Sequence, residues 1–247
     1  ISMTRIFKIL GLILMITSGQ IMLGQTTFNY KEDFKKVLLK TNDPNDNLYY
    51  EKLLKRFNVN DSTMTDFEVL ALLIGFTDKP EYKPYQDITT EREIYNLNGE
   101  DKFQEALDKG IKFIETHPLS VKVLFEIAYA YHKLGKGDNV KKYTYKGKRI
   151  FEAMYFSGDG TSMDTPAFAL GPADGQDFIY KAVGADIGTM GSGRDKDGNF
   201  IDILEAKFEG DKKMNLYFII QHATDKMFEG KSIEEELKKQ DKKKKEK

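Results

Sequence analysis

The sequence contains no cysteine, which excludes disulfide bonds, thiolate metal sites and cysteine nucleophiles. It also contains no tryptophan, so its 17 phenylalanines and 13 tyrosines must supply the largest side chains of a core. Neither sign of charge is in excess, because 38 Lys and Arg stand against 39 Asp and Glu. This balance does not favour a nucleic-acid partner, since proteins that bind nucleic acid usually carry a basic excess. With 247 residues, 40% of them hydrophobic, the chain can build a packed core.

Long apolar runs are also scarce, and the one near the start of the chain is typical of an export signal. Arg5 and Lys8 place positive charge ahead of an apolar stretch over residues 9–24, which polar residues interrupt. This stretch is short for a membrane-spanning helix and fits the apolar segment of a signal peptide. We therefore predict a signal peptide over 1–25 and an exported protein, periplasmic or extracellular, with no membrane span after signal removal.

The segment that follows has the pattern of successive helices. Apolar side chains recur at helical spacing over 28–41 and again over 47–57. The residues Thr-Asp-Phe-Glu at 65–68 form a capping box, which predicts a third helix that ends at Gly75. Two prolines between residues 78 and 87 then predict an irregular loop, because proline inside a helix removes a hydrogen bond. Thr90 is expected to open the next helix.

A 34-residue register relates residues 103–118 to residues 120–151, with Ala106 and Val140 in equivalent small apolar positions. The positions that follow the first helix read bulky, bulky, small, aromatic and turn glycine at Leu124, Ile127, Ala128, Tyr131 and Gly135. This order is typical of the tetratricopeptide repeat, a helix-turn-helix unit. Because a free-standing solenoid needs about three such units, the earlier helices must complete the stack.

The pattern changes at Ser157, where glycine, aspartate and proline become frequent. Strand patterns over 199–208 and 214–220 predict a hairpin, 167–170 a third strand, and 176–184 a short helix. The expected fold class is α+β: N-terminal tetratricopeptide-like helical hairpins packed with a small antiparallel C-terminal sheet. In chain order, the expected parts are a signal peptide (1–25), a helical, repeat-like half (26–156), an α+β half (157–230) and a charged tail (231–247).

The stretch GSGRDKDGNFIDILE, residues 191–205, resembles a calcium-binding loop only in part. With Gly198 in the turn position of such a loop, Gly193 stands where the first acid is needed and Leu204 where the bidentate glutamate is needed. Lys196 likewise breaks the glycine fingerprint of a dinucleotide-binding loop. We therefore predict a turn before a strand, with Asp-Gly supplying the positive φ, and we predict neither a metal site nor a cofactor.

One face of the predicted repeat is the first candidate binding surface. If residues 120–134 form the first helix of a repeat unit, the concave side carries Lys122, Phe125, Tyr129, His132 and Lys133. Repeat proteins bind peptides on this side, and aromatic rings flanked by lysines suit an extended peptide or an acidic chain end. The alternative is that the sheet half packs into the concavity and buries the two aromatic rings.

Two loops form the second candidate. Tyr82 and Tyr85 lie in the Pro-Tyr loop, and Asp159 and Asp164 lie in a Gly-Asp loop after the last helix. If the two loops meet, they offer the site of a hydrolase acting on an envelope or dietary polymer, or of a small-ligand binding module. The alternative for the second loop is a helix C-cap followed by a turn.

Four segments together resemble a family of exported Bacteroidota proteins known as domain of unknown function 4919: YYEKLLKRF, GFTDKPEYKPYQD, HPLSVKVLFEIAYAYHKLG and KKYTYKGKRIFEAMYFSGDGTSMDTPAF. The resemblance covers residues 49–228. It implies export, a repeat-like helical half and a mixed C-terminal half, and it implies no activity. Its characteristic turns carry Tyr82, Pro84, Tyr85, Asp159 and Gly160. The leading hypothesis is therefore an exported, non-enzymatic module that binds a protein or peptide partner in the cell envelope.

Overall fold

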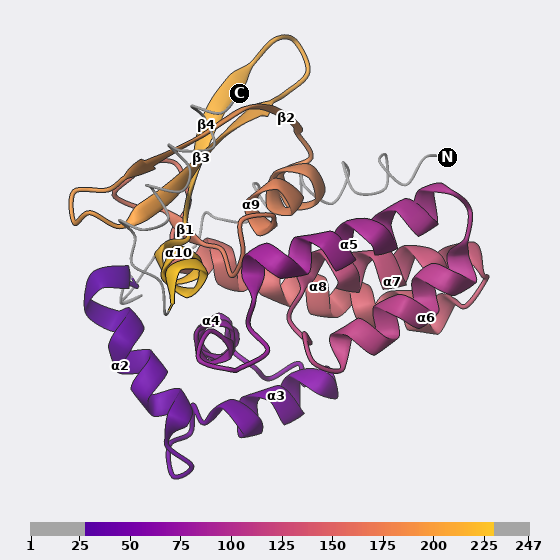
Figure 1. The fold of residues 1–247 in the computed structure, drawn as a ribbon, viewed down its shortest axis with the longest axis horizontal. Helices are drawn as coiled ribbons and strands as arrows, with labels where there is room; N and C mark the ends of the chain where they lie inside the picture. Colours follow the sequence, from indigo (N-terminus) through magenta and orange to yellow (C-terminus); the bar gives the residue numbers. More distant parts are fainter. Residues whose placement is uncertain (1–27, 230–247) are drawn as a thin grey trace, which may run out of the picture.

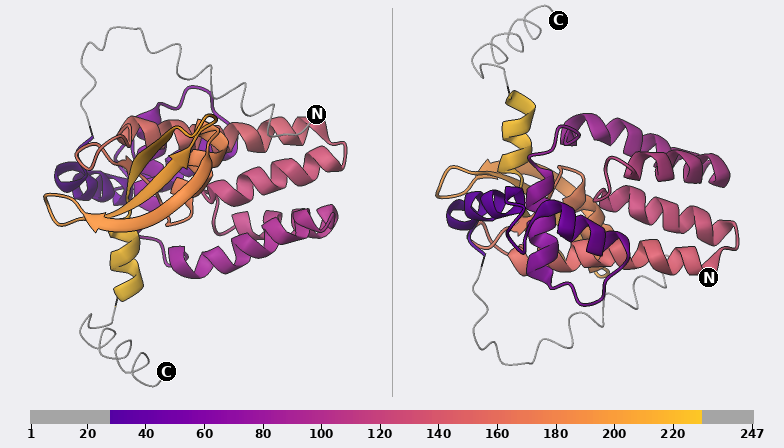
Figure 2. Two further views of the ribbon diagram at one scale, coloured as in Figure 1. Left: turned by 90° about the horizontal axis from the view of Figure 1, so that it is seen from above. Right: turned by 90° about the horizontal axis from the view of Figure 1, so that it is seen from below.

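The computed structural model describes residues 28–229, and helices follow one another through its first part (Figure 1). The predicted signal peptide (1–25) and the predicted charged tail (231–247) lie outside the described residues. The helices are α2 (Tyr30–Asn42), α3 (Tyr50–Asn58), α4 (Asp66–Phe76), α5 (Pro84–Gly99), α6 (Phe103–Ile114), α7 (Val121–Lys133) and α8 (Gly137–Ser157). Those expected from helical spacing are confirmed, and α8 ends at Ser157, where the sequence pattern changes. Helices α5 to α8 lie side by side in two views (Figure 2).

Helix α4 is the centre of the helical half. Its capping box is present, because Thr65 accepts a hydrogen bond from the Glu68 backbone amide while the Glu68 side chain accepts from the Thr65 amide. Every residue from 69 to 76 is buried, so this helix is apolar on all sides and is surrounded by α2, α3 and α8. Gly75 permits the close approach, since a Cβ there would lie 3.0 Å from the side chains of Thr41 and Tyr50.

Helix α5 begins at Pro84, so the prediction of an irregular loop up to residue 87 and a helix start at Thr90 is wrong. The second proline of that segment occupies the first helical turn. Proline is well suited to this position, because the amide it lacks would have no partner within the helix there. Tyr85 therefore lies in the first turn of a helix and not in a loop.

The C-terminal part confirms the α+β class and corrects the strand directions. The strands are β1 (Ala167–Phe168), β2 (Asp186–Arg194), β3 (Phe200–Lys207) and β4 (Lys213–Ile219), in the sheet order β1-β4-β3-β2. The pairs β2–β3 and β3–β4 are antiparallel, as expected of hairpins, but β1 pairs with β4 in parallel. The sheet is therefore mixed, because β1 reaches β4 by a long connection through the rest of the C-terminal part.

Strand β2 is an element that the sequence did not reveal. Its glycine-rich segment forms an edge strand, and the Glu205 side chain of β3 lies close over Gly188. The turn that follows is as predicted. Gly198 has a φ of 84°, and the Asp195 carboxylate accepts hydrogen bonds from the backbone amides of Asp197 and Asn199.

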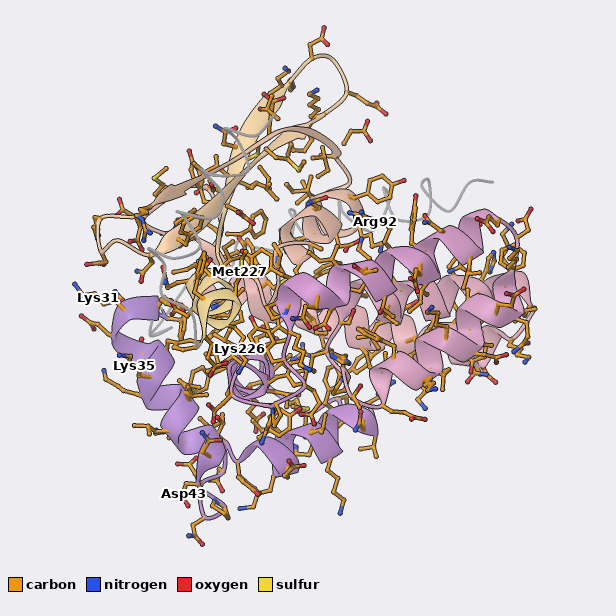
Figure 3. All side chains as sticks on the ribbon, in the orientation of Figure 1. Lys31, Lys35, Asp43, Arg92, Lys226 and Met227 are labelled. Atoms are coloured by element: carbon orange, nitrogen blue, oxygen red, sulfur yellow. The ribbon has the colours of Figure 1, made fainter. Side chains whose placement is uncertain are left out.

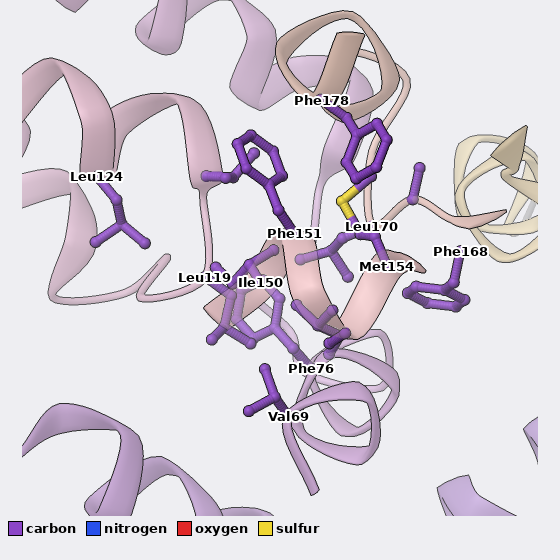
Figure 4. Packing of buried hydrophobic residues seen from close by; sticks show 14 of the residues in the cluster. Val69, Phe76, Leu119, Leu124, Ile150, Phe151, Met154, Phe168, Leu170 and Phe178 are labelled. Atoms are coloured by element: carbon purple, nitrogen blue, oxygen red, sulfur yellow. The ribbon is translucent and has the colours of Figure 1, made fainter. Parts of the chain in front are cut away.

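Three short helices join the sheet to the helical half: α9 (Asp174–Asp177), the π-helix η1 (Phe178–Val183) and α10 (Gln221–Phe228). Helix α9 contacts both α7 and β3, and Figure 1 shows it between the sheet and α5. Phe178 packs edge-on against Phe151 of α8, with the ring centroids 5.5 Å apart, and Met154 lies beside them (Figure 4). One hydrophobic core therefore runs through both halves.

Charged side chains cover the outside of this core. Lys31 and Lys35 extend outward from α2 (Figure 3), and Lys31 forms an ion pair of 2.6 Å with Asp197 in the turn between β2 and β3. Among residues 28–229, no helix is both long enough and apolar enough to cross a membrane.

His222 on α10 connects the two ends of the described chain. Its Nε2 donates a hydrogen bond of 3.0 Å to the Ala169 carbonyl, and its Nδ1 accepts one of 3.3 Å from the Tyr30 hydroxyl. The imidazole stacks on Phe168 with ring centroids 4.4 Å apart. Burial lowers the pKa of His222 to about 3, so the ring is neutral in the folded protein.

This buried histidine should make the protein sensitive to acid. Below its usual pKa of 6.5, the unfolded chain binds a proton at His222 that the folded protein does not bind. The free energy of unfolding therefore falls as the pH drops from 6.5 toward 3, by up to about 1.4 kcal/mol per pH unit. We expect His222→Gln to show a shallower pH dependence in urea denaturation at pH 7, 5.5 and 4. His132→Gln, which changes an exposed histidine, should keep the wild-type slope, and an equal slope in both variants would contradict the assignment.

Candidate binding site

The predicted concave surface is not open at Phe125. This side chain is only 4% exposed, and its ring stacks on Phe151 with centroids 5.3 Å apart. It also lies against Gly147, where a Cβ would come within 2.5 Å of the ring, while the Lys181 ammonium lies 5.1 Å above its centroid. The prediction that Phe125 faces a peptide groove is therefore wrong, because α8 and η1 enclose the ring.

The segment formed by α9 and η1 also contacts Lys122. The Lys122 ammonium lies 2.8 Å from the Asp177 carboxylate, which also forms an ion pair of 2.9 Å with Lys181. Lys181 in turn lies 3.6 Å from Glu126 of α7, which accepts a hydrogen bond of 2.9 Å from the Asn98 side chain. Burial alone would raise the pKa of Asp177, but the charges of Lys181 and Lys122 outweigh it and lower that pKa. The α9–η1 segment is thus fixed to α7 by buried ion pairs.

Solvent reaches the far end of the predicted surface most freely. Tyr129 is half-buried and packs edge-on against Phe103 of α6, with centroids 6.1 Å apart. The Lys133 ammonium lies 5.2 Å from the Phe103 ring centroid and 5.6 Å from that of Tyr129. His132 and Lys133 are exposed. The five predicted residues therefore divide into a covered pair and an accessible group of three.

The two predicted loops do not form one site. Tyr82 is buried, and its hydroxyl donates a hydrogen bond of 2.5 Å to the Leu170 carbonyl, while Tyr85 is half-buried. Asp159 instead accepts hydrogen bonds from the Thr161 amide and the Thr165 hydroxyl within its own turn.

Asp164 is exposed and forms an ion pair of 2.9 Å with Lys196. The turn interpretation therefore accounts for the contacts of both aspartates of that loop.

A small pocket lies between α5, the start of α7 and the residues that precede α9. We call it the α5–α7 pocket. Its volume is about 30 Å³, room for about two water molecules. Tyr82 lines it, but Asp159 and Asp164 do not. Its walls combine apolar and polar side chains: Phe76, Tyr82, Pro84, Asp87, Glu91, Phe113, His117, Leu119, Ser120, Leu170, Pro172, Ala173 and Asp174, with Gly171 among them.

Two buried carboxyl groups give the pocket its chemistry. Glu91 is 8% exposed, and one of its oxygens, Oε1, accepts a hydrogen bond of 2.6 Å from the Ser120 hydroxyl. Asp174 is 7% exposed, and its Oδ2 accepts a hydrogen bond of 2.9 Å from the Gly171 amide. Within residues 28–229, the second oxygen of each carboxyl group has no hydrogen-bond partner, and neither group forms an ion pair.

Both carboxyl groups hold their protons more tightly than usual. Burial raises the pKa of Asp174 to about 8, and the nearby charge of Glu91 raises it further than the Gly171 amide lowers it. Burial also raises the pKa of Glu91, against the opposing effect of its hydrogen bond from Ser120. Burial of a carboxyl group without a counter-ion reduces stability. Carboxyl groups with raised pKa values are therefore found more often where binding or catalysis requires them.

His117 and Asp87 form a separate pair in the same lining. The His117 Nε2 lies 3.3 Å from the Asp87 carboxylate and 3.0 Å from the Glu81 carbonyl, and its ring stacks on Phe113 with centroids 4.3 Å apart. Burial lowers the pKa of His117, but the hydrogen bond and charge of Asp87 outweigh it, so the pKa is raised. Asp87 is therefore the partner of His117, and neither buried carboxyl group has an ion-pair partner of its own, although the charge of Lys122 acts on both.

Sequence reasoning did not find Glu91 or Asp174. They belong to different halves of the chain and are brought together only when α9 packs against α5 and α7. No local spacing relates them, and each carboxyl group by itself resembles many others in a chain with 39 acidic residues.

Comparison with known proteins identifies the family. A family model matches residues 35–228. The chain belongs to the family described as Domain of unknown function (DUF4919). The match spans the helical half from within α2, the sheet and all of α10, so it includes every residue of the α5–α7 pocket. No similar curated protein and no similar solved structure were found.

The burial of Phe125 can be tested by stability. Phe125→Ala removes a ring enclosed by Gly147 and Phe151, so we expect a loss of about 3–5 kcal/mol in the free energy of unfolding. Tyr129→Ala removes a half-buried ring and is expected to cost about 1–2 kcal/mol. Urea denaturation followed by circular dichroism measures both. A Phe125→Ala protein as stable as the wild type would show that the ring does not belong to the core.

Asp174 should reduce stability at alkaline pH. Its pKa is raised from 3.8 to about 8, so the folded protein keeps a proton that the unfolded chain releases above pH 3.8. This contribution to stability is lost as the pH rises toward 8. We expect Asp174→Asn to be more stable than the wild type at pH 8 by about 1–3 kcal/mol, with no such gain at pH 4. Asp186→Asn, at an exposed position, is the matched control and should show no pH-dependent gain in thermal denaturation.

Proposed function

We propose that the protein is an exported, non-enzymatic module of the cell envelope that binds a protein or peptide, and that the α5–α7 pocket is its recognition site. The observation that carries this proposal is the size of the pocket, about 30 Å³. Pockets for whole small-molecule ligands usually measure about 300–1,000 Å³. A pocket of this size holds the end of one side chain, and a peptide presents such a side chain while its other residues contact the surrounding surface.

The export part of the proposal is supported by the start of the sequence. Positive charge at Arg5 and Lys8 precedes the apolar stretch 9–24, as in signal peptides. The lack of cysteine agrees with a protein whose core needs no disulfide bonds outside the cytoplasm. The accessible residues Tyr129, His132 and Lys133 offer a second contact area on the same helix that begins beside the pocket.

A hydrolase is the second candidate, because one specific observation favours it. Asp174 and Glu91 both have raised pKa values, as a general acid requires near neutral pH. If the protein cleaves an envelope or dietary polysaccharide, incubation with such polymers should release reducing ends, and Glu91→Gln or Asp174→Asn should abolish the release. No release by the wild type would eliminate this candidate.

The binding proposal is tested by peptide selection. We would select a phage-displayed library of random peptides on the immobilised chain from residue 26 onward, then measure the affinity of enriched peptides by fluorescence anisotropy. Ala173→Phe should weaken their binding by at least about tenfold, because a ring at this lining position closes the pocket. Ser192→Phe places the same ring on the exposed edge strand β2 and should bind as the wild type does.

Two results would contradict the binding proposal. The first is a selection that enriches no peptide above the background of the empty support. The second is enrichment of peptides whose affinity is the same for the wild type, Ala173→Phe and Ser192→Phe, since such peptides would bind away from the pocket.

A further inference from the structure

We propose that the α5–α7 pocket receives a primary ammonium group, the end of a lysine side chain of the bound partner, with Glu91 and Asp174 as its counter-ions. This inference rests on the proposed function and specifies the chemistry of that site. It follows from three features of the pocket: its unbalanced charge, the carboxyl oxygens that lack partners, and its shape.

The charges around the pocket balance except at two carboxyl groups. Asp177 forms ion pairs with Lys122 at 2.8 Å and with Lys181 at 2.9 Å. Asp87 pairs with His117 at 3.3 Å. Glu91 and Asp174 form no ion pair within residues 28–229, although each is less than one-tenth exposed. Lys122, a cation whose charge acts on both groups, is already paired with Asp177, so a further cation is needed for both carboxyl groups to be ionised.

Each of the two carboxyl groups has one oxygen without a hydrogen-bond partner among the described residues, and an ammonium group supplies the donors that such oxygens accept from. Glu91 uses only Oε1 and Asp174 uses only Oδ2 in hydrogen bonds among the described residues. Both side chains line the pocket. An ammonium group carries three donors and no acceptor, so it can donate to one oxygen of each carboxyl group without disturbing the bonds to Ser120 and Gly171. Two carboxyl groups are fewer than the six to eight oxygens that calcium requires, so an organic cation is the better fit.

The walls fit the stem of a lysine. Phe113, Leu119 and Leu170 contribute apolar surface beside the two acids. Lysine side chains bury their methylene stems along such surfaces while the charged end reaches a polar site. The volume of about 30 Å³ matches an ammonium with its last methylene group, about two water-sized groups, and is small for the planar guanidinium of arginine.

Binding of this kind is linked to proton release. In the empty pocket Asp174 is protonated at neutral pH, because burial raises its pKa to about 8, and burial also raises the pKa of Glu91. An entering ammonium favours the ionised forms, so it expels protons and binds more tightly as the pH rises toward 8. The titratable or charged groups that face the two carboxyl groups are Asp87 of α5, Lys122 of α7, Asp177 of α9, and Tyr82 and His117.

The test uses a small probe in place of the unidentified partner. We would titrate the chain from residue 26 onward with N-acetyl-lysine methylamide and follow backbone amide signals by NMR. The matched probe is N-acetyl-norleucine methylamide, which has the same stem without the ammonium group. We expect the lysine probe to shift the signals of Ser120, Gly171 and Asp174, and the norleucine probe to leave them unchanged. The affinity of the lysine probe should rise about tenfold from pH 6 to pH 8.

Variants test the counter-ions separately. Glu91→Gln and Asp174→Asn should each weaken the lysine probe by at least about tenfold, because each removes one negative charge. Asp186→Asn removes a charge on exposed β2 and should bind as the wild type does. Unchanged amide spectra of the free variants show that they are folded. Calorimetry at pH 7 in phosphate and in Tris, whose ionisation enthalpies differ, should reveal the released proton as a difference in observed heat.

Several outcomes would overturn the inference. Equal shifts with the norleucine probe would show that the pocket recognises only the apolar stem. Shifts elsewhere, unchanged affinity in both variants, or no binding at pH 8 would exclude an ammonium site. The peptide selection separates this failure from that of the proposed function: pocket-dependent peptides without lysine would keep the binding module and discard the ammonium, whereas no peptides at all would remove both.

Discussion

The structure depends on the ion pairs that Asp177 forms with Lys122 and Lys181. They fix the α9–η1 segment against α7, and this placement decides three other features of the molecule. It brings Phe178 into the core beside Phe151. It places the Lys181 ammonium over the ring of Phe125. It also positions Asp174 opposite Glu91 and so completes the α5–α7 pocket. Breaking a buried pair by removing one partner typically costs about 3–5 kcal/mol, because the remaining charge is left uncompensated.

The position of the α9–η1 segment on α7 decides which part of the helical half is left open for a binding partner. In a repeat protein, the concave face of such helices is the binding surface. Here the chain places its own segment on the corresponding part of α7, and the polar contacts that a bound peptide would make are made by Asp177 and Lys181. The proposed recognition site therefore lies at the border of this segment, where α5, α7 and the residues before α9 leave a pocket. The assignment of the helices to the tetratricopeptide class itself stays a prediction.

The sequence revealed most elements whose signals are local. The capping box at Thr65 and Glu68, the helical spacing of α2 and α7, and the Asp-Gly turn at Gly198 depend on neighbouring residues, and each prediction is confirmed. The sequence did not reveal elements whose formation depends on residues far away in the chain. The glycines of β2 have no strand propensity, and they form a strand because β3 pairs with them.

The candidate sites show the same limit. Helical spacing assigned Phe125 to an open face of α7, but spacing contains no information about what covers that face. Glu91 and Asp174 carry no motif that marks them, because their significance arises from burial and from a neighbour in the other half of the chain. The parallel pairing of β1 with β4 was missed for a similar reason, since it joins residues 167–168 to residues 218–219.

The contact between Tyr30 and His222 determines when the protein can finish folding. These residues are 192 positions apart, and with Phe34 and Phe168 they form one aromatic cluster. Contacts of such long sequence separation form late, because most of the chain must be ordered before they repay the entropy lost in closing the loop. During synthesis, Tyr30 and Phe34 of α2 cannot complete their contacts with His222 until α10 has left the ribosome. The aromatic cluster therefore stays incomplete until α10 has been synthesised, and in that interval its apolar side chains are open to factors that bind unfolded segments.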